Sequence, residues 1–511
     1  MTTHLDESAQ EPRTSPPTDR SIPIALFGLT LCLCLFRITH KSFWVDEGAS
    51  LVMSESWSSI HSAIFETGGN SFLYYVVLHL WRKVGEWDAW LRALSALAAA
   101  GAVPVLFFIG REFVHRNAAL LGALFLAFSP FFIAYGQELR GYSFGLFFIC
   151  LATLYLIRAV RRDAVTDWVG FVVSALLALF SHYYVLLVLL AHAFTLVVFF
   201  AKEVRWARAL AAAAAIGIVF FGFFAWAVLG ATQAQLSYLE APTIEAVVGL
   251  VKRFGGDYIN GTSRLAFVVY VAVAAVLAPL FVNFRGRSAA IGNVVGLVCW
   301  FGIPIALAFV LSLLWRPVFD YRYLIFCLPA LALLVSAAAD RLRSQIAVLV
   351  FATAVLVMPI AGLVNWYRAL PNADFRAAAA YIAKDVHGNE PLLLYAYFIR
   401  QPLLHYLSEP QGAPPAIPTI WQGNWLPHIT SVQLPEIDSE HVREIVRSHE
   451  GVWVVLAHDQ NSRLRRDEQR EQLVRAVGRE ARMVSEQKFT GIRVMYFKNN
   501  AVTGTMAKEA R

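Results

Sequence analysis

Long apolar runs separated by short polar segments dominate residues 22–365. A helix of about 20 apolar residues is long enough to cross the ~30 Å hydrocarbon core of a bilayer. The pattern therefore predicts an all-α polytopic membrane protein with about eleven membrane-spanning helices. These helices are expected to begin near Ile22, Leu91, Ala118, Tyr142, Asp167, Tyr184, Ala209, Leu265, Ala289, Tyr323 and Gln345.

One further apolar run, SFLYYVVLHLW at 71–81, is too short to cross a bilayer. We expect it to form an interfacial helix on the outer face, with its tyrosines and tryptophan at headgroup depth. The first outer loop then covers residues 39–90. Two adjacent carboxylates, Asp46 and Glu47, lie near its start, where the chain leaves the membrane.

The polar segments between the apolar runs alternate between two kinds. One kind is short and basic, which indicates the cytoplasmic side by the positive-inside rule. The other kind is rich in aromatic and mixed charged residues and is expected on the opposite side, with the N-terminus inside. The basic set is 111–117, 158–163, 202–208, 283–288 and 340–344, and the other set includes WVDEG, 136–142, 181–184, 233–264 and 315–323.

After residue 365 the pattern changes to alternating helix and strand signals, which predicts an α/β domain over 366–500. An odd number of crossings places this domain outside the membrane, opposite the N-terminus. Residues 1–21 and 501–511 are expected to be disordered, the first a cytoplasmic segment. The expected helices of the domain are 372–386, 439–449 and 466–477, and the expected strands are 391–398, 451–458 and 491–497.

The composition supports this picture, because 58% of the residues are hydrophobic and 15% are charged, against about 25% charged in soluble domains. The net charge of +7 comes largely from basic residues in the short loops, so it indicates membrane topology rather than nucleic-acid binding. All five cysteines lie in apolar runs without metal-ligand spacing, so neither a disulfide framework nor a cysteine metal site is expected.

The outer loops contain the residue types needed to transfer a sugar from a lipid phosphate. The acceptor hydroxyl needs one carboxylate base, whereas the phosphate leaving group needs cationic donors or a metal. A glycosidase would instead need two carboxylates flanking the bond. Each residue alone also has a plain structural role, as a cap, a surface ion pair or an interfacial aromatic. The candidates are Asp46, Glu47, Glu138, Arg140, His182, Tyr183, Lys252, Arg253, Tyr321 and Arg322.

Several segments, taken in order, resemble the glycosyltransferase C superfamily. The resemblance is to its bacterial branch of protein O-mannosyltransferase-like, aminoarabinose-transferase-like and Rgt-type lipopolysaccharide galacturonosyltransferase-like proteins, and it covers residues 22–365. The segments are the DE pair after the first helix, LYYVVLHLW followed by WLRALSAL, SPFFIAYGQELRGYSF, FSHYYVLLVLLAH and DYRYLIFCLPALALL.

The resemblance implies a polyprenyl-phosphate monosaccharide donor and inverting transfer on the outer side of the cytoplasmic (inner) membrane. Asp46 matches the family's general base, and Glu47 matches a partner that either orients the acceptor or shares a metal. Glu138 lies where metal-dependent members carry acidic ligands, so a divalent metal on Asp46 and Glu138 is left open and no cofactor is certain. Arg140 and Arg322 are the candidates for the donor phosphate.

Two other functions are compatible with the sequence. A transporter or flippase of lipid-linked sugar would concentrate its polar groups near the membrane midplane, whereas here they lie in the outer loops, which favours an enzyme. A sugar-binding protein without activity is the third reading. The expected partners are the lipid-linked donor, an envelope acceptor (lipid, glycan or protein) and membrane lipids. The sugar, the acceptor and the oligomeric state are not encoded in any recognisable motif.

Overall fold

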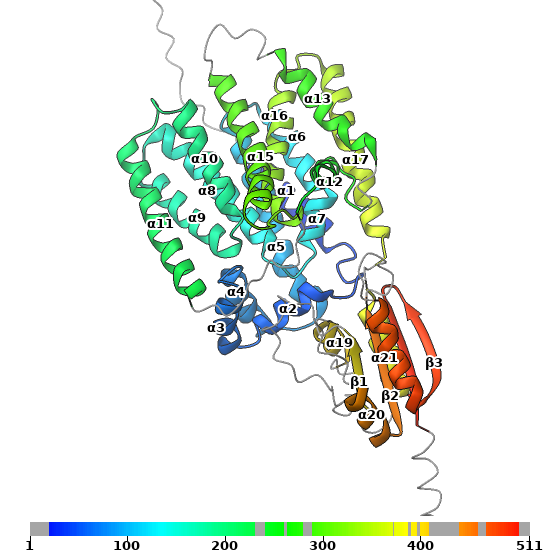
Figure 1. The fold of residues 1–511 in the computed structure, drawn as a ribbon. Coiled ribbons are helices and arrows are strands. Elements are labelled where there is room, and N and C mark those ends of the chain that lie inside the picture. The colour runs from blue at the N-terminus through cyan, green and yellow to red at the C-terminus, as the bar shows by residue number, and fades with distance from the viewer. Residues whose placement is uncertain are drawn as a thin grey trace, which may run out of the picture.

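The protein consists of a helical bundle with a small α/β domain at one end (Figure 1). The structure is a computed structural model, and the predicted fold class, a mostly helical membrane protein with a small C-terminal sheet, is confirmed. The structure describes residues 20–229, 241–259, 263–279, 289–370, 373–386, 390–395, 399–407, 439–457 and 467–499. Most of the two ends predicted to be disordered lies outside these residues.

Every apolar run predicted from the sequence coincides with a helix or with two successive helices. Five of the described helices are long and apolar enough to cross a membrane, and the pair α6–α7 forms a sixth candidate bent by 61°. Because the remaining apolar helices are shorter, the number of crossings stays a prediction. The bundle helices are α1 (Ser21–Leu35), α5 (Asp88–Arg111), α6 (Arg116–Phe128), α7 (Pro130–Gly136), α8 (Tyr142–Arg162), α9 (Val165–Ser181), α10 (Val185–Phe199), α11 (Trp206–Leu229), α13 (Val268–Leu277), α15 (Ala289–Leu314), α16 (Leu328–Ala339) and α17 (Gln345–Arg368).

The bend between α6 and α7 has a local cause. Ser129 has an extended backbone, as expected before a proline, and its hydroxyl accepts a hydrogen bond from the Phe132 N–H. After α7, Gln137 donates to the carbonyls of Cys34 and Phe36 at 2.8 Å. The bend and this clamp hold the loop that follows Gly136 against the end of α1.

The first outer loop forms a layer of three short helices at the end of the bundle nearest the C-terminal domain (Figure 1). The run at 71–81 is a helix of eleven residues, as its pattern indicated, while the other two helices of the loop were not predicted. Further short helices lie in the later outer segments. The six elements are α2 (Val45–Met53), α3 (Trp57–Glu66), α4 (Phe72–Arg82), α12 (Ile244–Phe254), η2 (Arg264–Phe267) and η3 (Arg322–Cys327).

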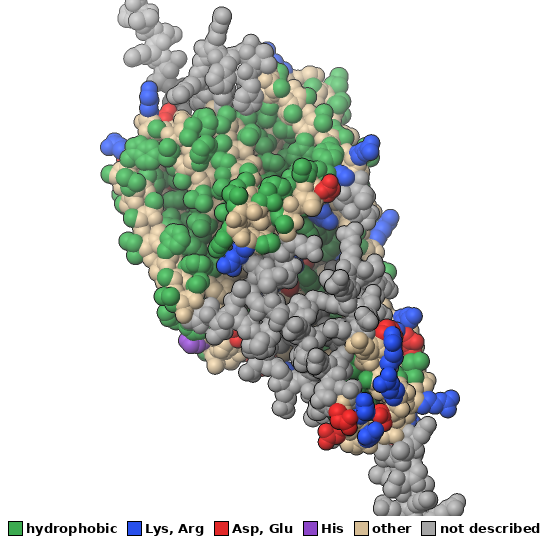
Figure 2. All heavy atoms as spheres, viewed as in Figure 1, with side chains coloured by type: hydrophobic (Ala, Val, Ile, Leu, Met, Phe, Trp, Pro, Cys, Tyr) green, Lys and Arg blue, Asp and Glu red, His purple; other side chains and the backbone are tan. Residues whose placement is uncertain are grey.

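Three of the basic loops, 111–117, 158–163 and 202–208, meet at the opposite end of the bundle. Glu112 pairs with Arg158 at 2.9 Å, and Asp163 pairs with Arg208 at 3.0 Å. These ion pairs join three loops of the predicted cytoplasmic set, so the charge pattern grouped them correctly. Between the two ends, the visible side of the bundle is covered mainly by hydrophobic side chains (Figure 2), as expected for a surface in contact with lipid.

The C-terminal domain has a four-stranded mixed sheet in the order β1-β2-β4-β3. Strands β1 and β2 are parallel, with Leu392 opposite Trp453, and the other two pairings are antiparallel. All three predicted helices and all three predicted strands are present, although parts of 391–398 and 451–458 lie outside the described residues. The elements are α18 (Phe375–Asp385), β1 (Leu392–Tyr395), α19 (Arg400–Leu407), α20 (Ser439–Ser448), β2 (Gly451–Ala457), α21 (Asp467–Glu480), β3 (Arg482–Phe489) and β4 (Ile492–Lys498).

Candidate functional site

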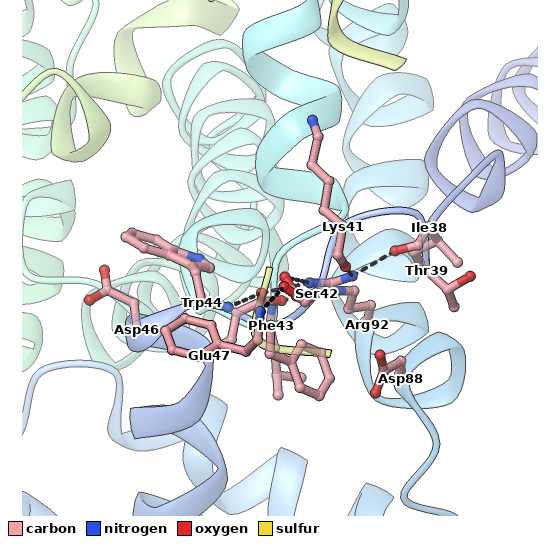
Figure 3. Close-up of polar contacts among 12 residues, drawn as sticks. Ile38, Thr39, Lys41, Ser42, Phe43, Trp44, Asp46, Glu47, Asp88 and Arg92 are labelled. Carbon is pink, nitrogen blue, oxygen red and sulfur yellow. Dashed lines mark hydrogen bonds and ion pairs between the residues drawn. The ribbon is translucent and has the colours of Figure 1, made fainter. Parts of the chain in front are cut away.

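The two adjacent carboxylates lie in the first turn of α2. The chain turns at Arg37, whose φ is 54°, and enters the helix that begins at Val45 through Trp44, which has an extended backbone. Carboxylates are favourable at a helix N-terminus because they face the positive end of the helix dipole. Since successive helical residues point about 100° apart, Asp46 and Glu47 face different partners. Figure 3 shows Asp46 directed away from Arg92, and Glu47 bonded to it.

Asp46 forms one ion pair and keeps one oxygen available. Its Oδ2 accepts a hydrogen bond from Arg322 Nη1 at 3.1 Å, and Arg322 is itself fixed by Asp320 at 2.9 Å. Among the described residues, Asp46 Oδ1 has no hydrogen-bond partner, and 30% of the side chain is exposed. One carboxylate oxygen is therefore oriented by an arginine, while the other can accept a proton from a bound molecule.

A second arginine, Arg140, lies beside this carboxylate and forms no ion pair in the part of the chain that the structure describes. Arg140 Nη1 donates to the backbone carbonyl of Asp46 at 3.3 Å. No carboxylate of the described residues forms an ion pair with this half-buried guanidinium. A guanidinium placed in this way can accept an anion at low cost, because no existing ion pair has to be broken.

Glu47 is buried and fully engaged, with 1% of the residue exposed. Its two oxygens accept hydrogen bonds from Arg92 Nε at 2.7 Å and Nη2 at 2.6 Å. They also accept the backbone N–H groups of Leu139 and Trp44, at 3.0 and 3.2 Å. With these acceptor positions occupied, the geometry favours a role for Glu47 in orienting the segment around it.

Arg92 uses all five of its N–H donors on the same segment (Figure 3). Besides the two bonds to Glu47, it donates to the carbonyls of Ile38, Lys41 and Ser42, at 2.7, 2.7 and 3.3 Å. A guanidinium has five donors in a fixed plane. One side chain on α5 therefore defines the path of the chain from residue 38 to residue 47.

A cavity of about 210 Å³ opens next to this segment. Two of its lining residues each have a polar atom, Glu138 Oε2 and Trp44 Nε1, that is buried without a hydrogen-bond partner among the described residues. Buried polar atoms are normally paired, so the wall of the cavity contains one unused acceptor and one unused donor. Its other lining residues include Lys41, Arg253, Tyr258, Tyr321 and Trp366, with Arg253 4.5 Å above the ring of Tyr321.

Glu138 has an unusual protonation equilibrium. Burial, followed by the nearby charges of Glu47 and Asp46, raises its pKa to about 8, although Arg322 and Arg140 act in the opposite direction. Lys41 lines the same cavity, and burial lowers its pKa to about 7. Near neutral pH the Glu138 carboxyl is therefore mostly protonated and can donate as well as accept a hydrogen bond.

This pKa gives a testable pH dependence. Between the ordinary value of 4.5 and the folded value of about 8, the folded protein binds one proton more than the unfolded chain, so Glu138 makes stability fall as pH rises. Glu138→Gln cannot titrate. The free energy of unfolding of this variant, minus that of the native protein, is therefore expected to increase from pH 5 to pH 7 by up to about 1.4 kcal/mol per pH unit. The difference between the two melting temperatures should increase in the same direction.

Differential scanning fluorimetry of both proteins in the same detergent measures this difference. The exposed Glu86→Gln is the control and should keep a constant difference from the native protein. A constant difference for Glu138→Gln as well would show that Glu138 has an ordinary pKa.

His182 lies behind the charged cluster. It is 3% exposed, and its ring packs against Tyr142, Tyr323 and Phe326 at 5.2–5.3 Å between centroids. Burial, reinforced by Arg140 and Arg322, lowers its pKa to about 3. The imidazole is therefore neutral near pH 7 and supports the aromatic wall.

The structure brings most of the predicted residues together but leaves two apart. Tyr183 donates to the carbonyl of Gly68 at 2.5 Å and so ties two outer loops to each other. Lys252 points toward Phe267, 6.0 Å from the ring centre. The residues gathered around the α2 N-terminus and the cavity are Asp46, Glu47, Glu138, Arg140, Arg253, Tyr321 and Arg322, with His182 behind them.

Comparison with known proteins identifies the fold. The sequence model of the family described as dolichyl-phosphate-mannose-protein mannosyltransferase matches residues 70–228. ArnT from Cupriavidus metallidurans bound to undecaprenyl phosphate is similar in structure, with a TM-score of 0.60 and 12% identity over 94% of this chain and 98% of that one. The chain has the glycosyltransferase C fold.

Other structures with the glycosyltransferase C fold agree with this assignment. The apo state of the same ArnT gives a TM-score of 0.60 at 13% identity, with the same coverage. The Archaeoglobus fulgidus oligosaccharyltransferase, in complex with Zn and sulfate, gives 0.50 at 14% identity over 94% of this chain and 73% of that one. No curated protein matches the sequence significantly. The family match and the shared fold together indicate a multi-pass membrane glycosyltransferase, as the sequence motifs had suggested.

Several residues of the site were missed from the sequence. Arg92 had one usable signal, because a lone arginine in the apolar stretch DAWLRALSAL must have a partner if it is buried. Lys41, Trp44 and Tyr258 had none, since a lysine or an aromatic residue at a membrane boundary is ordinary.

The described residues do not provide a complete metal site within this glycosyltransferase C fold. Asp46 and Glu138 are the two predicted ligands, and no group of three His, Cys, Asp or Glu side chains that could hold an ion is found in the described part of the chain. Asp46 faces two arginines, which disfavour a nearby cation.

Proposed function

We propose that the protein transfers a monosaccharide from a polyprenyl-phosphate donor to an extracytoplasmic acceptor, with inversion and with Asp46 as general base. The observation that carries this proposal is the Asp46 carboxylate, which has one oxygen held by Arg322 and one unoccupied, beside the unpaired Arg140. A base next to cationic groups is the combination that sugar transfer from a lipid phosphate requires.

The donor is expected to bind with its phosphate among the arginines and its polyprenyl chain along the bundle. ArnT of the same fold has been solved with undecaprenyl phosphate, which supports a lipid donor of this kind. Arg140 and Arg322 remain the candidates for the phosphate, and Arg253, which lines the cavity, joins them. The unused Glu138 Oε2 and Trp44 Nε1 offer an acceptor and a donor for sugar hydroxyls.

The reaction follows from this placement. The acceptor oxygen attacks the anomeric carbon and gives its proton to Asp46, while the bond from that carbon to the phosphate oxygen breaks. The bonding electron pair leaves with the polyprenyl phosphate, whose charge the arginines stabilise. Because nucleophile and leaving group occupy opposite sides of the carbon in a single displacement, the configuration inverts.

The site is proposed to face the outside of the cytoplasmic membrane. Three of the basic loops meet at the other end of the bundle, which the positive-inside rule places in the cytoplasm. The C-terminal domain then lies outside with the active site, and the acceptor is a molecule of the cell envelope.

Transfer in membrane vesicles tests the function. Vesicles containing the native protein are supplied with a panel of labelled polyprenyl-phosphate sugars, and label is followed on the donor and on other molecules. Movement of label from the donor to an acceptor would establish the transferase and name the sugar. Label that crosses the membrane still attached to its lipid would instead establish a transporter.

A further inference from the structure

We propose that the C-terminal domain positions the catalytic segment, and that the hydroxyl of Tyr406 is a positioning group for Asp46. This inference rests on the proposed function and adds to it a role for a domain whose described residues are not among the proposed catalytic groups. The active-site segment, residues 38–48, lies between the bundle and this domain, and each side holds it by a different set of bonds.

On the bundle side, α5 provides two anchors one helical turn apart. Arg92 binds the segment directly through its five donors, as described above. Asp88, 7% exposed, binds the C-terminal domain instead. Its Oδ2 accepts from Tyr406 at 2.8 Å and from Arg376 at 2.5 Å, and its Oδ1 lies 2.9 Å from His405 Nε2. A carboxylate with three side-chain partners fixes the domain to the same helix that fixes the active-site segment.

On the side of the C-terminal domain, backbone groups of the segment are held one after another. The Tyr406 oxygen accepts the Phe43 N–H at 2.7 Å. Ser42 Oγ donates to the Ala373 carbonyl at 2.7 Å and accepts from the Phe375 N–H at 3.1 Å. These bonds act on the two residues immediately before Trp44, the N-cap residue of α2.

Two further contacts with the C-terminal domain lie at the two ends of the segment. Arg376 donates to the Thr39 carbonyl at 2.8 Å. At the other end, Gly48 faces Pro402 so closely that an added Cβ would lie 2.7 Å from the Pro402 Cδ. The C-terminal domain therefore touches the segment before and after the acidic pair.

The consequence is geometric. The stretch from residue 39 to residue 44 has no helix or strand of its own, so its shape depends on these bonds. Asp46 follows it within α2, and a displacement of Trp44 moves the Asp46 carboxylate with respect to Arg322. Misplacement of a reacting group by about 1 Å can cost ~10²-fold in rate. Removal of the hydrogen bonds between the C-terminal domain and this segment should therefore affect turnover more than substrate binding.

Tyr406→Phe tests the proposal, because it removes only the hydroxyl and leaves Arg376 and His405 on Asp88. Steady-state transfer by purified protein in lipid nanodiscs should show kcat lowered by about tenfold with KM for the lipid-linked donor within twofold. The matched control is Tyr381→Phe, which removes a hydroxyl bonded to Ser485 inside the C-terminal domain. It should leave both constants at the native values.

A second variant covers the case in which Tyr406→Phe fails to fold. Ser42→Ala removes the two hydrogen bonds that the Ser42 hydroxyl forms with Ala373 and Phe375 of the C-terminal domain. It is expected to lower kcat in the same way and to leave KM for the donor nearly unchanged. Native kcat in Tyr406→Phe would overturn the proposal, as would native kcat in Ser42→Ala where Tyr406→Phe does not fold, or a raised KM at native kcat. So would an equal loss of kcat in Tyr381→Phe.

The same preparations separate this inference from the function on which it depends. If the native protein transfers sugar and Asp46→Asn does not, the proposed function stands, and the Tyr406 result decides the positioning role alone. If native protein and Asp46→Asn are equally inactive with every donor, the proposed function fails, and the positioning role falls with it.

Discussion

Asp46→Asn is expected to slow sugar transfer by about 10²–10⁴-fold, the usual contribution of a positioned general base. Asparagine keeps the size of the side chain and can still accept a hydrogen bond from Arg322 through its amide oxygen. It cannot take the proton of the acceptor hydroxyl. The loss should therefore appear in kcat, while the affinity for the lipid-linked donor changes little.

Single-turnover transfer and donor binding, measured on the same preparation, check this expectation. The control is Glu55→Gln, an exposed acidic residue just past the end of the same short helix, and it should retain native activity. Native-like turnover in Asp46→Asn would remove Asp46 from the mechanism. A loss confined to donor affinity would reassign Asp46 to binding.

Arg92→Met is expected to have the largest effect on stability. It leaves Glu47 buried at 1% exposure without its ion-pair partner, and breaking a buried pair in this way costs about 3–5 kcal/mol. It also frees the carbonyls of Ile38, Lys41 and Ser42. We expect a melting temperature lowered by several degrees, together with loss of transfer, because the segment before Asp46 loses its shape.

Two further variants show whether Arg92→Met acts through the unpaired charge of Glu47 or through the loss of the planar guanidinium donors. The double variant Arg92→Met with Glu47→Gln removes the buried charge and should recover part of the melting temperature without recovering transfer. Arg92→Lys keeps a charge but not the planar donors, so it should also remain inactive. The exposed pair Arg447–Glu480 provides the control. Arg447→Met should change stability by less than about 1 kcal/mol, and a similar change in Arg92→Met would contradict its role as anchor.

The bundle could be predicted from sequence because its signal is local. Runs of about 20 apolar residues must be helical in a bilayer, since no other arrangement satisfies the backbone there. The strands β2 and β4 were equally clear, because their side chains are largely buried and apolar. Strand β3 was not, since its residues RMVSEQKF are polar and mostly exposed, and only its pairing with β4 makes it a strand.

The candidate site was predictable in its residue types but not in its pairings. Both carboxylates of the DE pair were candidates, and only the resemblance assigned them different roles, because no physical property of the local sequence distinguishes the available Asp46 from the engaged Glu47. That distinction comes from Arg92 and Arg322, which are 45 and 276 residues away in the chain. Glu138 and Arg140 lie close together beside Asp46 and Glu47, whereas Tyr183 and Lys252, predicted for the same outer face, point elsewhere.

The close approach of Gly48 to Pro402 has a consequence for building chimeric enzymes. A side chain larger than hydrogen at position 48 would collide with the backbone and ring of the proline, so these two positions have to be compatible in any one protein. A C-terminal domain taken from a relative brings its own residue in place of Pro402 and its own surface facing α2. Recombinants that exchange this domain should therefore exchange residues 38–48 with it, which sets the crossover points at two places in the sequence.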